Sequence, residues 1–134
     1  MKRTGWLASM VVSAVVLTGC GGPGGREDAA TAVAVRFLEA VDGKDGEGAC
    51  ATLAPETLAD VEKSADAPCA QAILDEDLPG PGKVMTTNVY GQWAQVRMDN
   101  DTVFLAVFPG QWRVVAAGCQ PRGDRPYDCA VQGD

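Results

Sequence analysis

The hydrophobic period of the chain changes at a Leu-Pro-Gly-Pro-Gly run, residues 78–82. Before this run, apolar residues recur every three or four positions, as on one face of a helix. After it they alternate with polar residues, as on the two faces of a strand. Proline and glycine end both kinds of element within the run itself. The sequence therefore predicts a helical half followed by a strand half.

The helical half is expected to hold one long helix, residues 27–42, and several short ones. Six apolar residues of the long helix fall on one face: Ala30, Val33, Ala34, Phe37, Leu38 and Val41. A short turn is expected at residues 50–53. Pro55 suits the first position of a further helix, and Asp66 resembles the N-cap of a last turn. None of the short helices is long enough to be stable alone.

The strand half predicts four strands, at residues 83–90, 93–98, 102–108 and 112–118. The turns between them are so short that neighbouring strands must be antiparallel. The strand at 102–108 is apolar on both faces, so it is either covered twice or lines a pocket with its second face. The fold class is α+β, with helices packed on one face of a curved four-stranded sheet.

This order of elements resembles the cone of the nuclear transport factor 2-like superfamily, and a cystatin-like arrangement would give a similar pattern. The resemblance implies an apolar pocket, in which the cyclases and isomerases of that superfamily use inward-pointing Asp or Tyr groups. Thr86, Asn88 and Tyr90 are candidates to face inward. No interior strand position carries a carboxylate, so the sequence departs from the pattern where catalysis would need it.

The chain begins with the features of a secretory signal. Lys2 and Arg3 precede an apolar stretch, residues 6–17, which is shorter than the roughly 20 residues needed to cross a bilayer. A transmembrane anchor is therefore the weaker alternative. The Leu-Thr-Gly-Cys run at residues 17–20 resembles a bacterial lipobox. That resemblance implies cleavage before Cys20, acylation of Cys20, as by palmitate, and a location on the extracytoplasmic face of the cell membrane.

The expected domain organisation follows from this processing site. Residues 1–19 form the signal peptide, and residues 20–26 form a lipidated flexible tether because glycine loses much backbone entropy on ordering. Residues 27–134 form a single α+β domain.

The remaining cysteines predict two disulfides. Cys20 is assigned to the lipid, which leaves an even set of Cys50, Cys69, Cys119 and Cys129 in an exported domain. Three pairings are possible, and the pairs that close short loops are favoured, Cys50 with Cys69 and Cys119 with Cys129. A zinc site is the weaker alternative, because no CxxC spacing is present and the chain has no histidine.

The last third of the chain carries a further resemblance. A Trp-Arg-Val-Val-Ala-Ala-Gly-Cys-Gln-Pro stretch at residues 112–121 is followed by Arg-Pro-Tyr-Asp-Cys at 125–129. Together they resemble the closing motif of small actinobacterial lipoproteins, in which a last strand runs into a Pro-rich disulfide loop. The resemblance supports location and fold, and it implies no activity.

Composition excludes several classes of function. Cleavage removes two of the 11 basic residues and none of the 18 acidic ones, so the net charge becomes −9. We expect no nucleic-acid partner for such a polyanion. Without histidine, and with Ser64 as the last serine after cleavage, the usual hydrolase constellations are missing. We therefore expect no enzyme.

Three other candidate sites are weak. The carboxylates at residues 75–77 and 99–101 could attract a cation, but a solvated helix end and a hairpin turn explain them. Glycine and lysine at residues 80–83 lack the spacing of a phosphate loop. Tyr90, Trp93 and Trp112 could form a stacking platform, but aromatic residues on strands more often belong to the core or form cross-strand pairs, and the core is favoured.

The sequence thus predicts a membrane-anchored, non-catalytic lipoprotein of the cell envelope without metal or cofactor. Its domain would bind a partner protein or a small apolar ligand. A cone-pocket enzyme of cyclase or isomerase type and a purely structural envelope protein are the alternatives.

Overall fold

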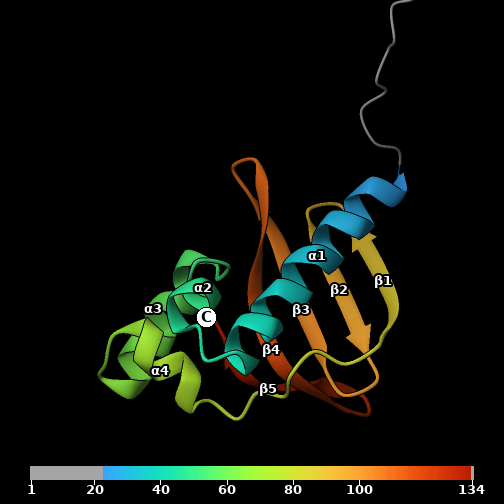
Figure 1. Cartoon of the computed structure of the whole chain (residues 1–134). Coiled ribbons are helices and arrows are strands. Elements are labelled where there is room, and N and C mark those ends of the chain that lie inside the picture. The colour runs from blue at the N-terminus through green and yellow to red at the C-terminus, as the bar shows by residue number, and fades with distance from the viewer. Residues whose placement is uncertain (1–22, 134) are drawn as a thin grey trace, which may run out of the picture.

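The computed structural model describes residues 23–133 as helices followed by strands (Figure 1). The helices are α1 (Pro23–Asp42), α2 (Gly46–Cys50), α3 (Pro55–Ala65) and α4 (Cys69–Asp75). The strands are β1 (Val84–Tyr90), β2 (Trp93–Met98), β3 (Thr102–Phe108), β4 (Gln111–Arg122) and β5 (Arg125–Gln132). The α+β class and the predicted order of helices before strands are confirmed.

The strands form one antiparallel sheet in the order β1-β2-β3-β4-β5, which follows the chain. The sheet is open, with β1 and β5 at its edges. Register shifts interrupt the pairing in three places, at Val84/Thr86, Phe104/Leu105 and Gln120/Arg122. Such bulges bend strands and increase their twist. The sheet is accordingly curved, most visibly along the long strand β4 (Figure 1).

The prediction of four strands was wrong. The last predicted strand does not end at residue 118 but continues to Arg122, and a fifth strand follows where a Pro-rich loop was expected. Pro121 lies at the register shift in β4, and Pro126 lies in the edge strand β5. Proline lacks only an N–H, so bulges and edge strands tolerate it. The two prolines mark a hairpin and not a loop.

Helix α1 begins at Pro23 and not at residue 27. Proline and the two glycines after it are compatible with a first helical turn, where the N–H groups have no partner within the helix. Residues 23–26 of the segment expected to be a tether are therefore helical. The signal peptide and Cys20 lie outside the residues that the structure describes. Within the described residues, no helix is long and apolar enough to cross a membrane.

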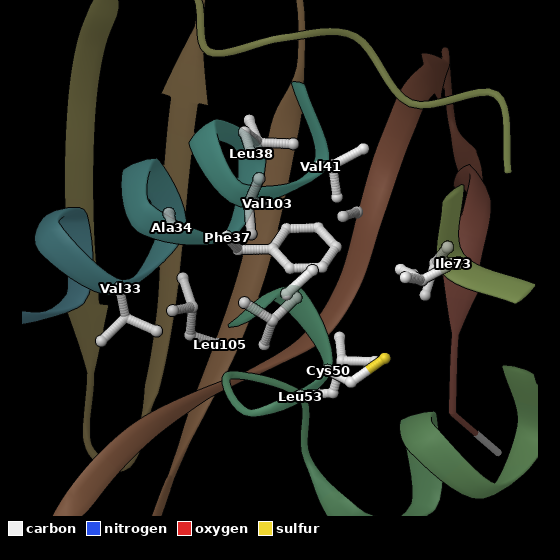
Figure 2. Packing of buried hydrophobic residues seen from close by; sticks show 14 of the residues in the cluster. Val33, Ala34, Phe37, Leu38, Val41, Cys50, Leu53, Ile73, Val103 and Leu105 are labelled. Atoms are coloured by element: carbon white, nitrogen blue, oxygen red, sulfur yellow. The ribbon is translucent and has the colours of Figure 1, made fainter. Parts of the chain in front are cut away.

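The predicted apolar face of α1 is confirmed, since all six of its residues are buried. Phe37 and Leu38 pack with Val103 and Leu105 of β3, and all four side chains are fully buried (Figure 2). Leu53 and Ile73 extend the same cluster towards the short helices. The core therefore fills the space between α1 and the sheet.

The short helices α2, α3 and α4 gather at the C-terminal end of α1 (Figure 1). The disulfide Cys50–Cys69 joins α2 to α4, as predicted. An added Cβ at Gly46 would lie 1.9 Å from the carbonyl oxygen of Ala70, so only glycine allows this approach. Asp66 was predicted as an N-cap, but it ends α3 in a left-handed conformation, and Pro68 is the residue before α4. Asp residues tolerate this conformation better than most.

Candidate binding groove

The two faces of the sheet differ in what covers them. Ala94, Val96, Val103, Leu105 and Val114 belong to the core cluster beneath α1. Because side chains alternate along a strand, Trp93, Gln95, Phe104 and Ala106 point to the opposite face. We call this opposite side the groove face.

The tip of the β4–β5 hairpin covers part of the groove face. The ring of Tyr127 meets the ring of Phe104 edge-on, with centroids 5.1 Å apart. The amide Nε2 of Gln95 lies 3.4 Å from the hydroxyl oxygen of Tyr127. These contacts join β5 to β2 and β3, two strands with which it does not pair. They leave the other part of the groove face open, towards the β1–β2 turn.

A groove of about 460 Å³ occupies this open part. Its floor includes Ala106 and Ala116, which are buried but do not belong to the core cluster. Trp93 and Phe108 form an aromatic wall, and Trp93 is 59% exposed. The groove exists because two small side chains lie beside large ones. Its volume is within the range of small-molecule sites.

The opposite wall of the groove is the first turn of α3, with Ala54, Glu56 and Thr57, beside the end of β5. The hydroxyl of Thr57 donates to the carbonyl of Val115 at 3.0 Å. The same carbonyl accepts from the N–H of Gly133 at 3.1 Å. These polar groups are thus engaged with each other. Of the lining residues that the structure describes, Glu56 alone is ionisable, and it is exposed.

The aromatic candidates are divided between the two faces. Trp112 is buried in the core, as the sequence favoured. Tyr90 and Trp93 form a cross-strand pair, which the sequence also allowed, but they are 66% and 59% exposed, so the preference for the core was wrong for these two residues. Their positions at the ends of β1 and β2 explain this, because the strand period sets the face of a residue but not whether that face is covered.

The residues expected to face a cone pocket lie on the groove face, away from α1. Thr86 and Tyr90 are exposed, and the side chain of Thr87 between them points to α1, where its hydroxyl lies 2.6 Å from that of Thr31. Val89 packs against the core. The alternation of β1 therefore places Thr86, Asn88 and Tyr90 on the face away from α1.

Asp101 lies in the predicted hairpin turn, but its carboxylate is buried and not surrounded by water. Its side chain is 4% exposed. Its Oδ1 accepts from the N–H groups of Thr102 at 2.7 Å and Cys119 at 2.9 Å, and its Oδ2 accepts from Gly118 at 3.2 Å. Burial raises the pKa of Asp101, and the three backbone hydrogen bonds oppose that rise. The carboxylate ties the β2–β3 turn to the bend of β4.

The other carboxylates of the predicted clusters serve local structure or face solvent. Asp99 accepts from the N–H of Lys83 at 2.9 Å, and Asn100 donates to the carbonyl of Gly80 at 3.0 Å. Asp75 and Asp77 are exposed. Across residues 23–133 there is no group of three or more Cys, Asp or Glu residues arranged to hold a metal ion.

The disulfide Cys119–Cys129 links directly paired positions of β4 and β5, as predicted. It holds the hairpin whose tip carries Tyr127. Both cysteine pairs are therefore part of the framework around the groove and not of its lining. Ser64 is exposed near the end of α3.

Comparisons of the chain with protein-family models, with curated proteins and with solved structures gave no match.

Proposed function

We propose that this protein is an exported lipoprotein, anchored through Cys20, whose domain binds a small apolar ligand without chemical turnover. The observation that carries the proposal is the groove between Trp93 and the first turn of α3. An apolar hollow with an aromatic wall offers a ligand more buried contact than a flat surface. The predicted signal peptide and the lipobox resemblance support the anchor.

The composition of the groove favours binding over catalysis. Acid–base catalysis needs a group of suitable pKa within hydrogen-bond reach of the substrate. Glu56 is exposed at the rim, and the hydroxyl of Thr57 is already donated to Val115. The groove thus provides apolar contact and shape. A hydrocarbon or a flat ring system fits that chemistry better than a sugar or a nucleotide, whose many polar groups would have only Glu56, Gln92 and Gln132 as side-chain partners beside the engaged Thr57.

Acid–base catalysis remains the second candidate because of one observation, the buried carboxylate of Asp101 with its raised pKa. Such groups are common in active sites. Both oxygens of Asp101, however, accept backbone hydrogen bonds that hold β4 in place. We therefore assign this residue a structural role.

Binding of a neutral fluorescent probe, N-phenyl-1-naphthylamine, tests the groove. We expect Ala106→Leu to weaken probe binding by about tenfold, because the longer side chain occupies the floor, a change of about 1.4 kcal/mol. Ala59→Leu adds the same atoms at an exposed position of α3 and serves as the control. Equal affinity in Ala106→Leu and wild type would exclude the groove as the binding site.

Native mass spectrometry of protein recovered from its own membrane identifies the occupant. A retained small apolar molecule supports the proposal. A retained protein partner, displaced by Trp93→Ala, would instead assign the groove face to protein binding. A ligand that leaves chemically altered and is no longer altered by the Asp101→Asn variant would establish an enzyme.

A further inference from the structure

Exposed aromatic residues lie at the end of the domain where α1 begins. Tyr90 and Trp93 are exposed and flank the β1–β2 turn, and the half-buried Phe108 lies at the start of the β3–β4 turn. The β1–β2 turn lies beside the first turns of α1, and the β3–β4 turn projects from the same edge of the sheet, farther from the helix (Figure 1). We call the two turns, residues 90–93 and 108–111, together with the first turn of α1, the aromatic end.

Arg26 attaches the first turn of α1 to this end. Its guanidinium donates to the carbonyl of Gly91 in the β1–β2 turn. The same guanidinium lies 5.4 Å from the ring centroid of Trp112, near the start of β4. The start of the helix is therefore held by contacts of Arg26 with the β1–β2 turn and with Trp112 of β4.

The proposed lipid attachment site is close to this end in the chain. Only Gly21 and Gly22 lie between Cys20 and Pro23. The three Cα–Cα steps from Cys20 to Pro23 can span at most about 11 Å. Acyl chains on Cys20 would thus hold the start of α1 within about 11 Å of the point where they enter the bilayer. That distance exceeds the thickness of one headgroup layer, about 5–8 Å, by only a few ångströms.

The chemistry of the aromatic end suits a lipid surface. Tyr and Trp concentrate at membrane interfaces because their rings are apolar and their polar atoms still reach water. Residues 90–93 and 108–111 contain no charged side chain, and the start of α1 contributes Arg26, Glu27 and Asp28. By contrast, residues 46–75 contain six acidic residues and one basic residue. These acidic helices lie at the other end of α1, which is about 30 Å long, so headgroup phosphates would repel the far end of the domain.

We propose that the aromatic end rests on the bilayer, with Tyr90 and Trp93 at the boundary between the headgroups and the acyl chains and helices α2–α4 directed away from it. The inference rests on the proposed acylation of Cys20. It gives the domain one orientation on the membrane, in which the aromatic wall of the groove lies at the lipid surface and an apolar ligand can enter from the bilayer.

Brominated lipids, which quench tryptophan at the level of the acyl chains, test this orientation. The mature acylated protein is placed in phosphatidylcholine vesicles with and without bromine. Wild type is compared with three variants, all of which carry Trp93→Phe to remove the exposed tryptophan. The first carries no other change, the second also carries Tyr90→Trp, and the third also carries Met85→Trp. Met85 is a matched control because it is 59% exposed and lies on the same strand, about 17 Å from Tyr90.

We expect loss of emission in brominated vesicles for wild type and for the variant with Tyr90→Trp. Trp93→Phe alone and the variant with Met85→Trp should keep their emission, because Trp112 is buried and position 85 is distant from the lipid. Two results in protein that floats with the vesicles would overturn the orientation: equal quenching of tryptophan at positions 85 and 90, or no quenching at either position. Both results leave the proposed anchor intact. If mass spectrometry finds no acyl group on the protein and the protein does not float with the vesicles, the proposed anchor is wrong, and the orientation that rests on it is wrong as well.

Discussion

The core face and the groove face of the sheet use alternating residues of the same strands, yet one is filled and the other is hollow. On the core face, Leu105 and Val103 meet Phe37 of α1 and leave no exposed surface. On the groove face, Ala106 follows Leu105 in the sequence and pairs with Trp93 of β2, without a covering helix. The difference shows that a hollow arises where small residues alternate with large ones and no second layer packs on them.

The largest expected difference between the two faces is in the loss of stability when a large side chain is truncated to alanine. Phe37→Ala should lower the free energy of unfolding by about 3–5 kcal/mol, because it leaves a cavity in a packed core. Trp93→Ala should change it by about 0.5 kcal/mol, since the side chain is mostly in water. Denaturant unfolding of both variants measures the difference. A similar loss in both would mean that the groove face contributes to the core.

An intermediate effect comes from adding volume instead of removing it. Ala34→Leu forces extra atoms into the core beneath α1 and should cost about 1–3 kcal/mol. Ala106→Leu places the same atoms in the open groove and should change stability by about 0.5 kcal/mol or less while it weakens probe binding. Thermal unfolding of the pair is the measurement. If Ala106→Leu proved the more destabilising, position 106 would be closely packed in solution and the groove would not be open to a ligand.

The smallest expected effect concerns the bend of β4 that brings Tyr127 to the groove face. Asp101→Asn cannot accept the hydrogen bond from Gly118, which should cost about 1 kcal/mol. Burial raises the pKa of Asp101, so the folded state binds this proton more tightly than the unfolded state. The stabilisation is present below the ordinary pKa of about 4 and is lost as the pH rises through the folded value.

Wild type should therefore exceed Asp101→Asn in stability by more at pH 4 than at pH 7. Urea unfolding of both proteins across this range gives the comparison. A difference that grows with pH would show that the hydrogen bonds from Thr102, Gly118 and Cys119 outweigh desolvation.

Much of the framework could be predicted from residue patterns. The 3.6-residue period placed the buried face of α1, and alternation placed β2 and β3 at their observed bounds. The two disulfides were predicted because cysteines that close short loops favour each other. These features depend on neighbours in the chain, so local physics is sufficient for them.

The fifth strand and the groove depended on contacts between distant residues. In the sequence, Pro121 and Pro126 indicated a loop. In the structure, a bulge in β4 accommodates Pro121 and the edge position of β5 accommodates Pro126. Asp101 resembled a solvated turn residue until Gly118 and Cys119 supplied donors from another strand.

The sequence by itself determined that Trp93 and Gln95 lie on the face of their strand opposite Ala94 and Val96, because side chains alternate along strands. Only the tertiary structure decided that this face stays open there. Its cover is set by how far the β4–β5 hairpin bends over the sheet and by where α3 begins. Both are properties of packing between distant segments, which the period of a single strand does not encode.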